Sequence, residues 1–339
     1  MSSTPMEKIK AYHSIKPFVS KNELNEVASM LNLTEVDRTK RVEGKEAEFE
    51  FLLMCHLLGK LENSIAFEEG VSRLTNTVTT DFLFITKDNR RLAIEVKSTE
   101  KEKWDNITNN RLTSQEDFAK LVNAELYFAI KIRNHWIFLS SQYIRKQQFK
   151  ITLQEDSKNS ELNILGEKSF GILKPITFKS TYNQKKVTLF ENQDWGFLTK
   201  YSIQVGKIKT LKKSITSEAN SLFYRTVLEA LQRFASNHSQ QVIKIDNNKT
   251  LVIEKLEAGH EFKLSHFLLA PIRLISHDIH GNYDLTTYVT EIFDERKDQL
   301  ISSNMVIGTL FELHEKGLDI VEVREGKLYP INDLYERDD

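Results

Sequence analysis

The segment TTDFLFITKDNRRLAIEVKST, from Thr79 to Thr99, carries the pattern that decides the fold. Two apolar runs, Phe82–Ile85 and Leu92–Val96, are separated by a polar segment that contains Asp, Asn and Arg. Short apolar runs of this kind are typical of buried strands, and Asp and Asn favour a tight turn between them. We therefore predict a β-hairpin that brings Asp81, at the start of the first run, close to Glu95 in the second.

Glu95 and Lys97 flank Val96 and, because side chains two apart on a strand share a face, they point the same way. Charged side chains are seldom buried unless they are paired, and strands this apolar suggest coverage on both faces. Two carboxylates and one ammonium at the strand ends then form a group that can hold a divalent metal ion. An exposed hairpin with a surface ion pair is the alternative from this pattern alone.

A helix is expected upstream, leading from Arg41 to Leu58 with apolar residues at helical spacing. Glu46, Glu48 and Glu50 compete for any inward-facing role, because residues two apart lie on different faces of a helix. At most one of them should reach the site. Alternatively, all three are solvated acids that the helix dipole favours.

Downstream of the hairpin, Thr113 or Ser114 is expected to cap a second helix, followed by strands over residues 128–132 and 136–139. This helix would include Asp117, Phe118, Leu121, Val122 and Leu126. A helical crossover after the strand that carries Glu95 is what a right-handed βαβ connection requires.

Taken together, Gly44-x-x-x-Glu48, Asp81 and Glu95-Val96-Lys97-Ser98 resemble the PD-(D/E)XK nuclease superfamily, in particular archaeal Holliday-junction resolvases and Mrr-like restriction nucleases. The resemblance spans roughly residues 43–139 and implies an α/β, restriction-endonuclease-like core, a mixed sheet flanked by helices. It implies that the catalytic residues are Glu48, Asp81, Glu95 and Lys97.

Two further positions bear on this resemblance. Ser72 stands where resolvases often carry a serine, and we assign it a contact with DNA. The proline that usually precedes the aspartate is replaced by Thr80, at a position that varies in the family.

The expected chemistry is metal-assisted phosphodiester hydrolysis. Asp81 and Glu95, with the backbone carbonyl of Val96, would bind Mg²⁺, for which Mn²⁺ can substitute; Mg²⁺ prefers one or two carboxylates plus substrate phosphate. Glu48 would hold a metal-bound water or a second ion. Lys97 would orient or help deprotonate the attacking water, or stabilise the developing charge.

Composition permits this hypothesis without requiring it. The chain has 339 residues and a net charge of −1, so any contact with DNA must come from local patches. A single cysteine, Cys55, argues against disulfides and a zinc site and fits a reducing cytoplasm. No apolar run approaches the length of a membrane span, and no signal peptide is evident, so we expect a soluble cytoplasmic protein.

We expect three regions: an N-terminal helical extension over residues 1–40, a nuclease domain over 41–150, and an α+β recognition or assembly domain over 165–339. The extension should contain a helix capped by Ser20. Polar, turn-rich sequence between Gln148 and Phe170 marks the expected boundary.

The second half is expected to contain strands between Phe170 and Leu198, a helix over residues 217–234 and a hairpin over 242–253. Helices near 287–300 and 303–316, followed by a hairpin over 320–329, resemble a winged-helix unit, a common DNA reader. Glu312 and Glu315 would repel phosphates, however, so a structural or dimerisation role is the alternative.

The most basic stretch could follow a phosphate backbone, although a run of lysines can equally form a solvated surface. Its residues assigned to DNA binding are Lys207, Lys209, Lys212 and Lys213.

The resemblance thus implies a Mg²⁺-dependent DNA endonuclease, and the large appendage favours a restriction or defence type. Within this class, a Holliday-junction resolvase and a transposase endonuclease subunit are alternatives. A non-catalytic DNA- or protein-binding module on the same scaffold is the alternative outside it. Expected partners are DNA, a second copy of the chain in a homodimer, and a protein of a defence or transposition complex.

Overall fold

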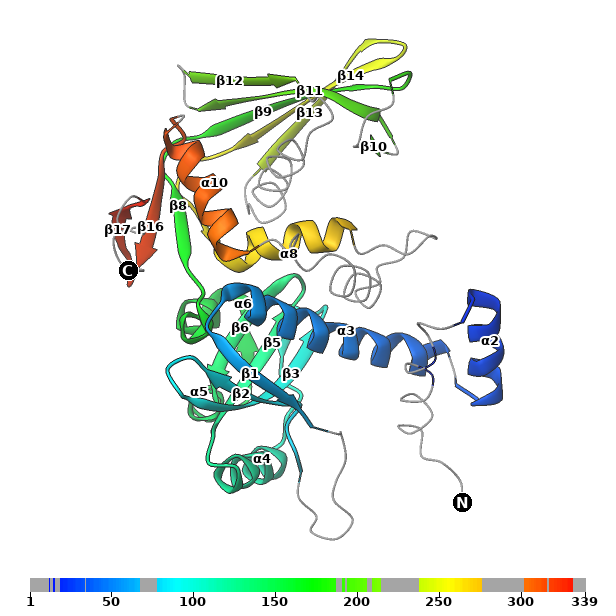
Figure 1. The fold of residues 1–339 in the computed structure, drawn as a ribbon, viewed down its shortest axis with the longest axis vertical. Helices are drawn as coiled ribbons and strands as arrows, with labels where there is room; N and C mark the ends of the chain where they lie inside the picture. Colours follow the sequence, from blue (N-terminus) through cyan, green and yellow to red (C-terminus); the bar gives the residue numbers. More distant parts are fainter. Residues whose placement is uncertain are drawn as a thin grey trace. The chain divides into compact units, whose positions relative to one another are not determined.

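The structure, a computed structural model, describes residues 12, 15, 19–33, 35–67, 78–186, 191–192, 194–205, 209–214, 238–275, 302–315 and 317–331. The chain divides into two compact units (Figure 1). The first comprises residues 1–166 and 275–300, and the second comprises residues 167–274 and 301–339. None of the helices in the described ranges is long and apolar enough to cross a membrane.

The first unit contains a five-stranded mixed sheet in the order β1-β2-β3-β5-β6. Its strands are β1 (Leu61–Ala66), β2 (Phe82–Thr86), β3 (Arg91–Thr99), β5 (Glu125–Ile132) and β6 (His135–Ser140). Strands β1, β2 and β3 form an antiparallel meander, β5 runs parallel to β3, and β6 returns antiparallel to β5. The predicted hairpin and the predicted mixed sheet flanked by helices are confirmed.

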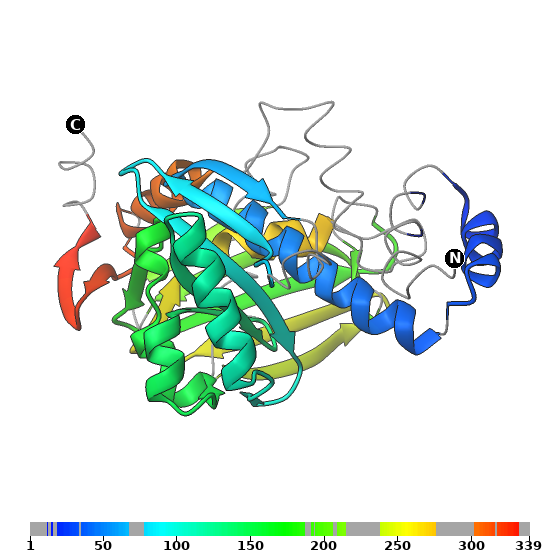
Figure 2. The same cartoon turned by 90° about the horizontal axis from the view of Figure 1, so that it is seen from below.

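Helices cover both faces of this sheet: α3 (Glu35–Leu58) lies on one face and α4 (Asn109–Leu121) on the other (Figure 2). Phe51 of α3 stacks on Phe84 of β2, with ring centroids 6.1 Å apart. Residues of α4 instead pack in a cluster with Ala93 of β3. The residue just before Ala93 pairs with Phe84, so Ala93 itself points to the opposite face. Because side chains alternate along a strand, these contacts define two separate apolar layers.

Smaller elements complete the first unit. They are α2 (Lys21–Met30), β4 (Lys103–Trp104), α5 (Ser141–Lys146), β7 (Ile151–Thr152), α6 (Leu153–Asp156), η2 (Ser157–Asn159) and η3 (Leu162–Leu165). Ser20 caps α2 as predicted, because its side chain accepts a hydrogen bond from the Glu23 backbone N–H. The Ser20 backbone N–H in turn donates to the Glu23 carboxylate at 2.8 Å. This reciprocal arrangement is a capping box.

Helix α4 begins earlier than predicted. Its N-cap is Thr108, whose hydroxyl accepts a hydrogen bond from the Arg111 backbone N–H at 3.3 Å. The prediction that Thr113 or Ser114 caps the helix is therefore wrong. All three residues are chemically competent caps, so the residue type alone does not select among them.

The C-terminal end of α4 also differs from the prediction. The helix ends at Leu121, and Asn123 adopts a left-handed conformation with φ of 51°. Leu126, which we expected in the helix, lies in β5 and packs in the core cluster beneath α4. Burial of this side chain in the sheet outweighs its preference for a helix.

The second unit contains two antiparallel sheets and two described helices. The larger sheet has the order β10-β11-β9-β14-β13, with β12 paired to β11, and the smaller has the order β15-β8-β16-β17. The larger sheet comprises β9 (Ile176–Asn183), β10 (Glu191–Asn192), β11 (Gly196–Val205), β12 (Lys209–Ser214), β13 (His238–Asp246) and β14 (Lys249–Leu256). The smaller comprises β8 (Ser169–Ile172), β15 (His260–Lys263), β16 (Ile320–Arg324) and β17 (Lys327–Pro330); the helices are α8 (Leu264–Ile275) and α10 (Ser303–Glu315).

Several predicted elements of this unit are confirmed, including the hairpin of β13 and β14, helix α10 and the hairpin of β16 and β17. The predicted helices over 217–234 and 287–300 lie outside the described residues. The C-terminal hairpin does not stand alone, because β16 pairs with β8 in the smaller sheet. The winged-helix arrangement therefore stays a prediction.

Glu50 of α3 anchors the helix to the sheet. The side chain is 1% exposed, and its carboxylate accepts hydrogen bonds from Lys131 Nζ and from Trp136 Nε1, both at 3.0 Å. A buried carboxylate is tolerated only when it is paired and hydrogen-bonded in this way.

We expect Glu50→Ala to lower the free energy of unfolding by about 3 kcal/mol, because it leaves the Lys131 and Trp136 donors without their acceptor in a buried position. Urea unfolding followed by circular dichroism measures the loss. The control is Glu62→Ala, which removes an exposed glutamate of β1 and should change stability by less than about 0.5 kcal/mol. Equal effects of the two substitutions would contradict the anchoring role.

Candidate active site at the ends of strands β2 and β3

The register of the β2–β3 hairpin places Asp81 against Glu95. Phe82 pairs with Ile94, so the residue before Phe82 falls opposite the residue after Ile94. The Asp81 backbone N–H donates to the Ile94 carbonyl at 3.0 Å, and the Val96 backbone N–H donates to Asp81 Oδ2 at 2.6 Å. The backbone of β3 therefore fixes the position of the Asp81 carboxylate.

Two cations converge on the Glu95 carboxylate. Lys97 Nζ lies 2.6 Å from Glu95 Oε1, and Arg111 Nη2 lies 3.1 Å from the same oxygen. Glu95 is only 2% exposed, whereas Lys97 and Arg111 are 27% and 53% exposed. Lys97 Nζ also donates to the Val96 carbonyl at 2.9 Å. The buried Glu95 carboxylate is thus paired with two cations whose side chains are partly exposed to solvent.

Asp81 has a strongly perturbed environment. Burial, together with the neighbouring charges of Glu95 and Glu48, raises the pKa of its carboxyl group from 3.8 to about 7, against the opposing effects of Lys97 and the Val96 N–H. The contribution of Glu48 shows that this α3 residue lies within electrostatic range of Asp81. Like charges from two elements therefore act on the buried Asp81 carboxyl group, as at many functional sites.

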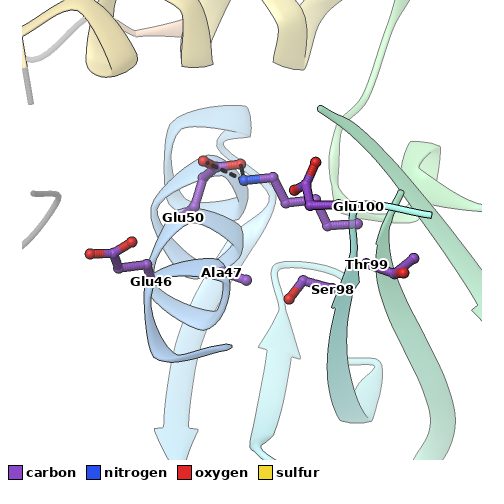
Figure 3. Close-up of a pocket in the computed structure, with 7 residues that line it drawn as sticks. Glu46, Ala47, Glu50, Ser98, Thr99 and Glu100 are labelled. Carbon is purple, nitrogen blue, oxygen red and sulfur yellow. Dashed lines mark hydrogen bonds and ion pairs between the residues drawn. The ribbon is translucent and has the colours of Figure 1, made fainter. Parts of the chain in front are cut away.

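The other two glutamates of α3 occupy a different place. Glu46 and Glu50 line a pocket of about 140 Å³ between α3 and the ends of β3 and β5, together with Ala47, Ser98, Thr99, Glu100 and Lys131 (Figure 3). Glu50 is committed to its ion pair with Lys131. Among the three competing glutamates, Glu48 is thus the one whose charge acts on Asp81.

The remaining predicted contact residues are Ser72 and four lysines of the basic stretch. Ser72 and Lys207 lie outside the described residues. Lys209, Lys212 and Lys213 lie in strand β12 of the second unit, where they pair with strand β11. Their contact with DNA stays a prediction.

Sequence reasoning missed two residues of α4, Arg111 and Gln115. They lie one turn apart on the same helix face. Gln115 is 0% exposed, and neither its Oε1 nor its Nε2 has a hydrogen-bond partner among the described residues. The signal was the cap at Thr108, because a helix that starts there carries Arg111 in its first turn.

The residues present fit a hard divalent cation in their chemistry. Asp81 and Glu95 offer carboxylate oxygens, Val96 offers a carbonyl, and Mg²⁺ prefers such ligands. A cation would also relieve the repulsion that raises the pKa of Asp81. Within the described ranges, however, no three His, Cys, Asp or Glu side chains are grouped so that they could hold a metal ion.

Comparisons with known proteins add little. No protein-family model and no curated protein matches the chain. Among solved structures, the chain is similar to Hjc from Archaeoglobus fulgidus, a Holliday junction resolvase of an archaeal hyperthermophile. The identity is 24%, the match covers 33% of this chain and 89% of the resolvase, and the TM-score is 0.28. A likeness with so low a score carries no weight for function, which rests on the side chains of the site.

We expect Asp81→Asn to stabilise the protein, and increasingly so as the pH rises from 5 to 8. Because the pKa in the folded state, about 7, exceeds the ordinary 3.8, ionising Asp81 disfavours folding across this range. The gain at pH 8 should exceed the gain at pH 5 by about 2 kcal/mol. Urea unfolding in EDTA at both pH values measures it.

The control for this pH dependence is Asp88→Asn in the hairpin turn. A hydrogen bond from Thr86 lowers the pKa of Asp88, so this carboxylate is ionised in the folded and the unfolded state throughout this range, and its replacement should show no pH trend between pH 5 and 8. A gain for Asp81→Asn that is independent of pH would contradict the assigned environment.

We expect Gln115→Met to raise the free energy of unfolding by about 1 kcal/mol, because a buried amide that has no hydrogen-bond partner among the described residues is replaced by an apolar side chain of similar volume. Thermal and urea unfolding measure the change. Leu112→Ala, which truncates a buried neighbour in the same helix, should lower stability and serves as the opposite reference. Destabilisation by Gln115→Met would show that the amide has polar partners.

Proposed function

We propose that this protein is a divalent-metal-dependent endonuclease that hydrolyses phosphodiester bonds in DNA, with Mg²⁺ as the cofactor and Mn²⁺ as a substitute. The observation that supports this most directly is the buried Asp81–Glu95 pair, with Lys97 on the same strand. Such a group of charges has a cost in stability and no evident structural benefit, which is typical of functional sites.

Each residue has a role in this proposal. Asp81, Glu95 and the Val96 carbonyl would hold the divalent ion, and Glu48 would orient a water or assist a second ion. The ion, when bound, supplies charge neutralisation at the phosphoryl group and a more acidic water. Lys97, whose ammonium already donates to Glu95 and to the Val96 carbonyl, orients the attacking water and stabilises charge on the phosphoryl oxygens.

The proposal extends to the biological type and assembly. A restriction or defence enzyme fits a chain whose second unit exceeds what a junction resolvase usually requires. Cleavage of both strands of a duplex is achieved most simply by a homodimer, in which two copies present one site to each strand. A protein partner of a defence or transposition complex would dock on the second unit.

One observation favours a second candidate function, a non-catalytic DNA- or protein-binding module on the same scaffold. Lys97 and Arg111 already pair with Glu95, as they would in a purely structural ion cluster. The two candidates differ in what the loss of Lys97 should do. A structural cluster would lose stability, whereas an enzyme would lose cleavage with its fold retained.

We expect the purified protein to nick supercoiled plasmid in Mg²⁺ or Mn²⁺ but not in EDTA, and Lys97→Ala and Asp81→Asn to lower the rate by at least about 100-fold. Lys120→Ala, which removes an exposed lysine paired with Asp117, is the matched control and should cleave normally. Linear, branched and methylated DNA run alongside would separate a restriction enzyme from a resolvase.

Metal binding gives a readout that does not depend on cleavage. Mg²⁺ should raise the melting temperature of the unaltered protein and should leave that of Asp81→Asn unchanged, because only the former retains the ligand set. Full nicking by the Lys97→Ala protein would reject the assigned catalytic site. Metal-independent DNA binding without any cleavage would favour the non-catalytic module.

A further inference from the structure

Arg111 belongs to a different structural element from the other charged residues around Glu95. It lies in the first turn of α4, where Thr108 accepts a hydrogen bond from its backbone N–H. The hairpin supplies Asp81, Glu95 and Lys97, whereas Arg111 reaches the same carboxylate from a separate element. The positive end of the α4 dipole adds to the charge of the guanidinium at this place.

The guanidinium of Arg111 is only partly used. Its one side-chain contact within the described residues is the hydrogen bond from Nη2 to Glu95 Oε1 at 3.1 Å. A guanidinium has five N–H donors in a planar fork that matches a carboxylate or a phosphate in a bidentate manner. With 53% of the side chain exposed, the remaining donors are accessible to a ligand that arrives from solvent.

Glu95 does not depend on Arg111 for its charge balance. Lys97 Nζ lies closer to the same oxygen, at 2.6 Å, and is the more buried of the two cations. An exposed arginine that shares an acceptor with a nearer lysine contributes little to stability. Its placement is better explained by contact with an anion at the site.

We propose that Arg111 is a phosphate clamp with two partners, a role that rests on the proposed function. Without metal and DNA it pairs with Glu95. With a divalent ion held by Glu95, Arg111 would lose that oxygen as its acceptor, and its guanidinium would bind the phosphodiester oxygens of the DNA. Arg111 is thus a substrate-binding residue that the hairpin pattern alone does not contain.

The experiment measures DNA binding and metal binding separately for Arg111→Gln. Binding of a fluorescent DNA duplex in Ca²⁺, used in place of Mg²⁺, is followed by anisotropy over a range of salt concentrations. We expect affinity to fall about tenfold and the salt slope to decrease by about one, as for the loss of one phosphate contact. Arg111→Lys keeps the charge but lacks the planar fork of donors, so its affinity for DNA should lie between those of the unaltered protein and Arg111→Gln.

In the absence of DNA, the affinity of Arg111→Gln for a divalent metal ion should rise, whereas its affinity for DNA falls. Titration with Ca²⁺ or Mn²⁺, followed by the melting temperature, should show binding to Arg111→Gln about threefold tighter, because a competing cation has left Glu95. A purely structural role would weaken both kinds of binding together. The matched control is Arg90→Gln, which removes an arginine–glutamate pair at the turn end of the hairpin and should alter neither.

The outcomes separate the two proposals. If the unaltered protein binds and cleaves DNA but Arg111→Gln has the same affinity and salt slope, the clamp is rejected and the nuclease proposal stands. If DNA and metal binding weaken together with the melting temperature, Arg111 is structural and the clamp is again rejected. If the unaltered protein neither binds nor cleaves DNA, the proposed function fails, and the clamp fails with it.

Discussion

The pairing register of β2 and β3 is the constraint on which the site depends. Side chains alternate along a strand, so a slip of one residue would move every side chain of β3 to the other face of the sheet. Ile94 would then face α4, and Glu95 would enter the layer that Phe51 and Phe84 occupy. Hydrogen bonds from the Val96 and Asp81 backbone N–H groups hold the observed register at the end that carries the charges.

The first unit buries two kinds of acid with opposite consequences. Glu50 has two donors, Lys131 and Trp136, and its ionised form is fully compensated inside the protein. Asp81 accepts from the Val96 N–H, but its burial and the charges of Glu95 and Glu48 disfavour its ionised form. The first is part of the packing between helix and sheet. The second is disfavoured when ionised, and the rest of the fold offsets its cost.

The sequence permitted accurate prediction where local signals agree. The hairpin followed from two apolar runs and a turn segment in which Asn89 adopts a left-handed φ of 63°. The start of α4 was misplaced because hydroxyl side chains offered several caps, and with it Arg111 was missed. The pairing of β8 with β15 and β16 could not be predicted either, because these strands are far apart in the sequence and only tertiary packing brings them together. The roles of Asp81 and its neighbours stay predictions, because geometry alone does not measure chemistry.

The crossover explains why a helix residue, Arg111, contacts a carboxylate that the hairpin carries. Strands β3 and β5 are parallel, so the chain must leave the C-terminal end of β3, cross one face and return, and α4 is that crossing. The first turn of such a helix begins near the end of the strand it follows, on the face it covers. Glu95 and Lys97 point to that face, since the alternate residues of β3 pack beneath α3. A long side chain in the first turn of α4 can therefore reach them as a consequence of the topology, and Arg111 adds a partly exposed cation from a second element.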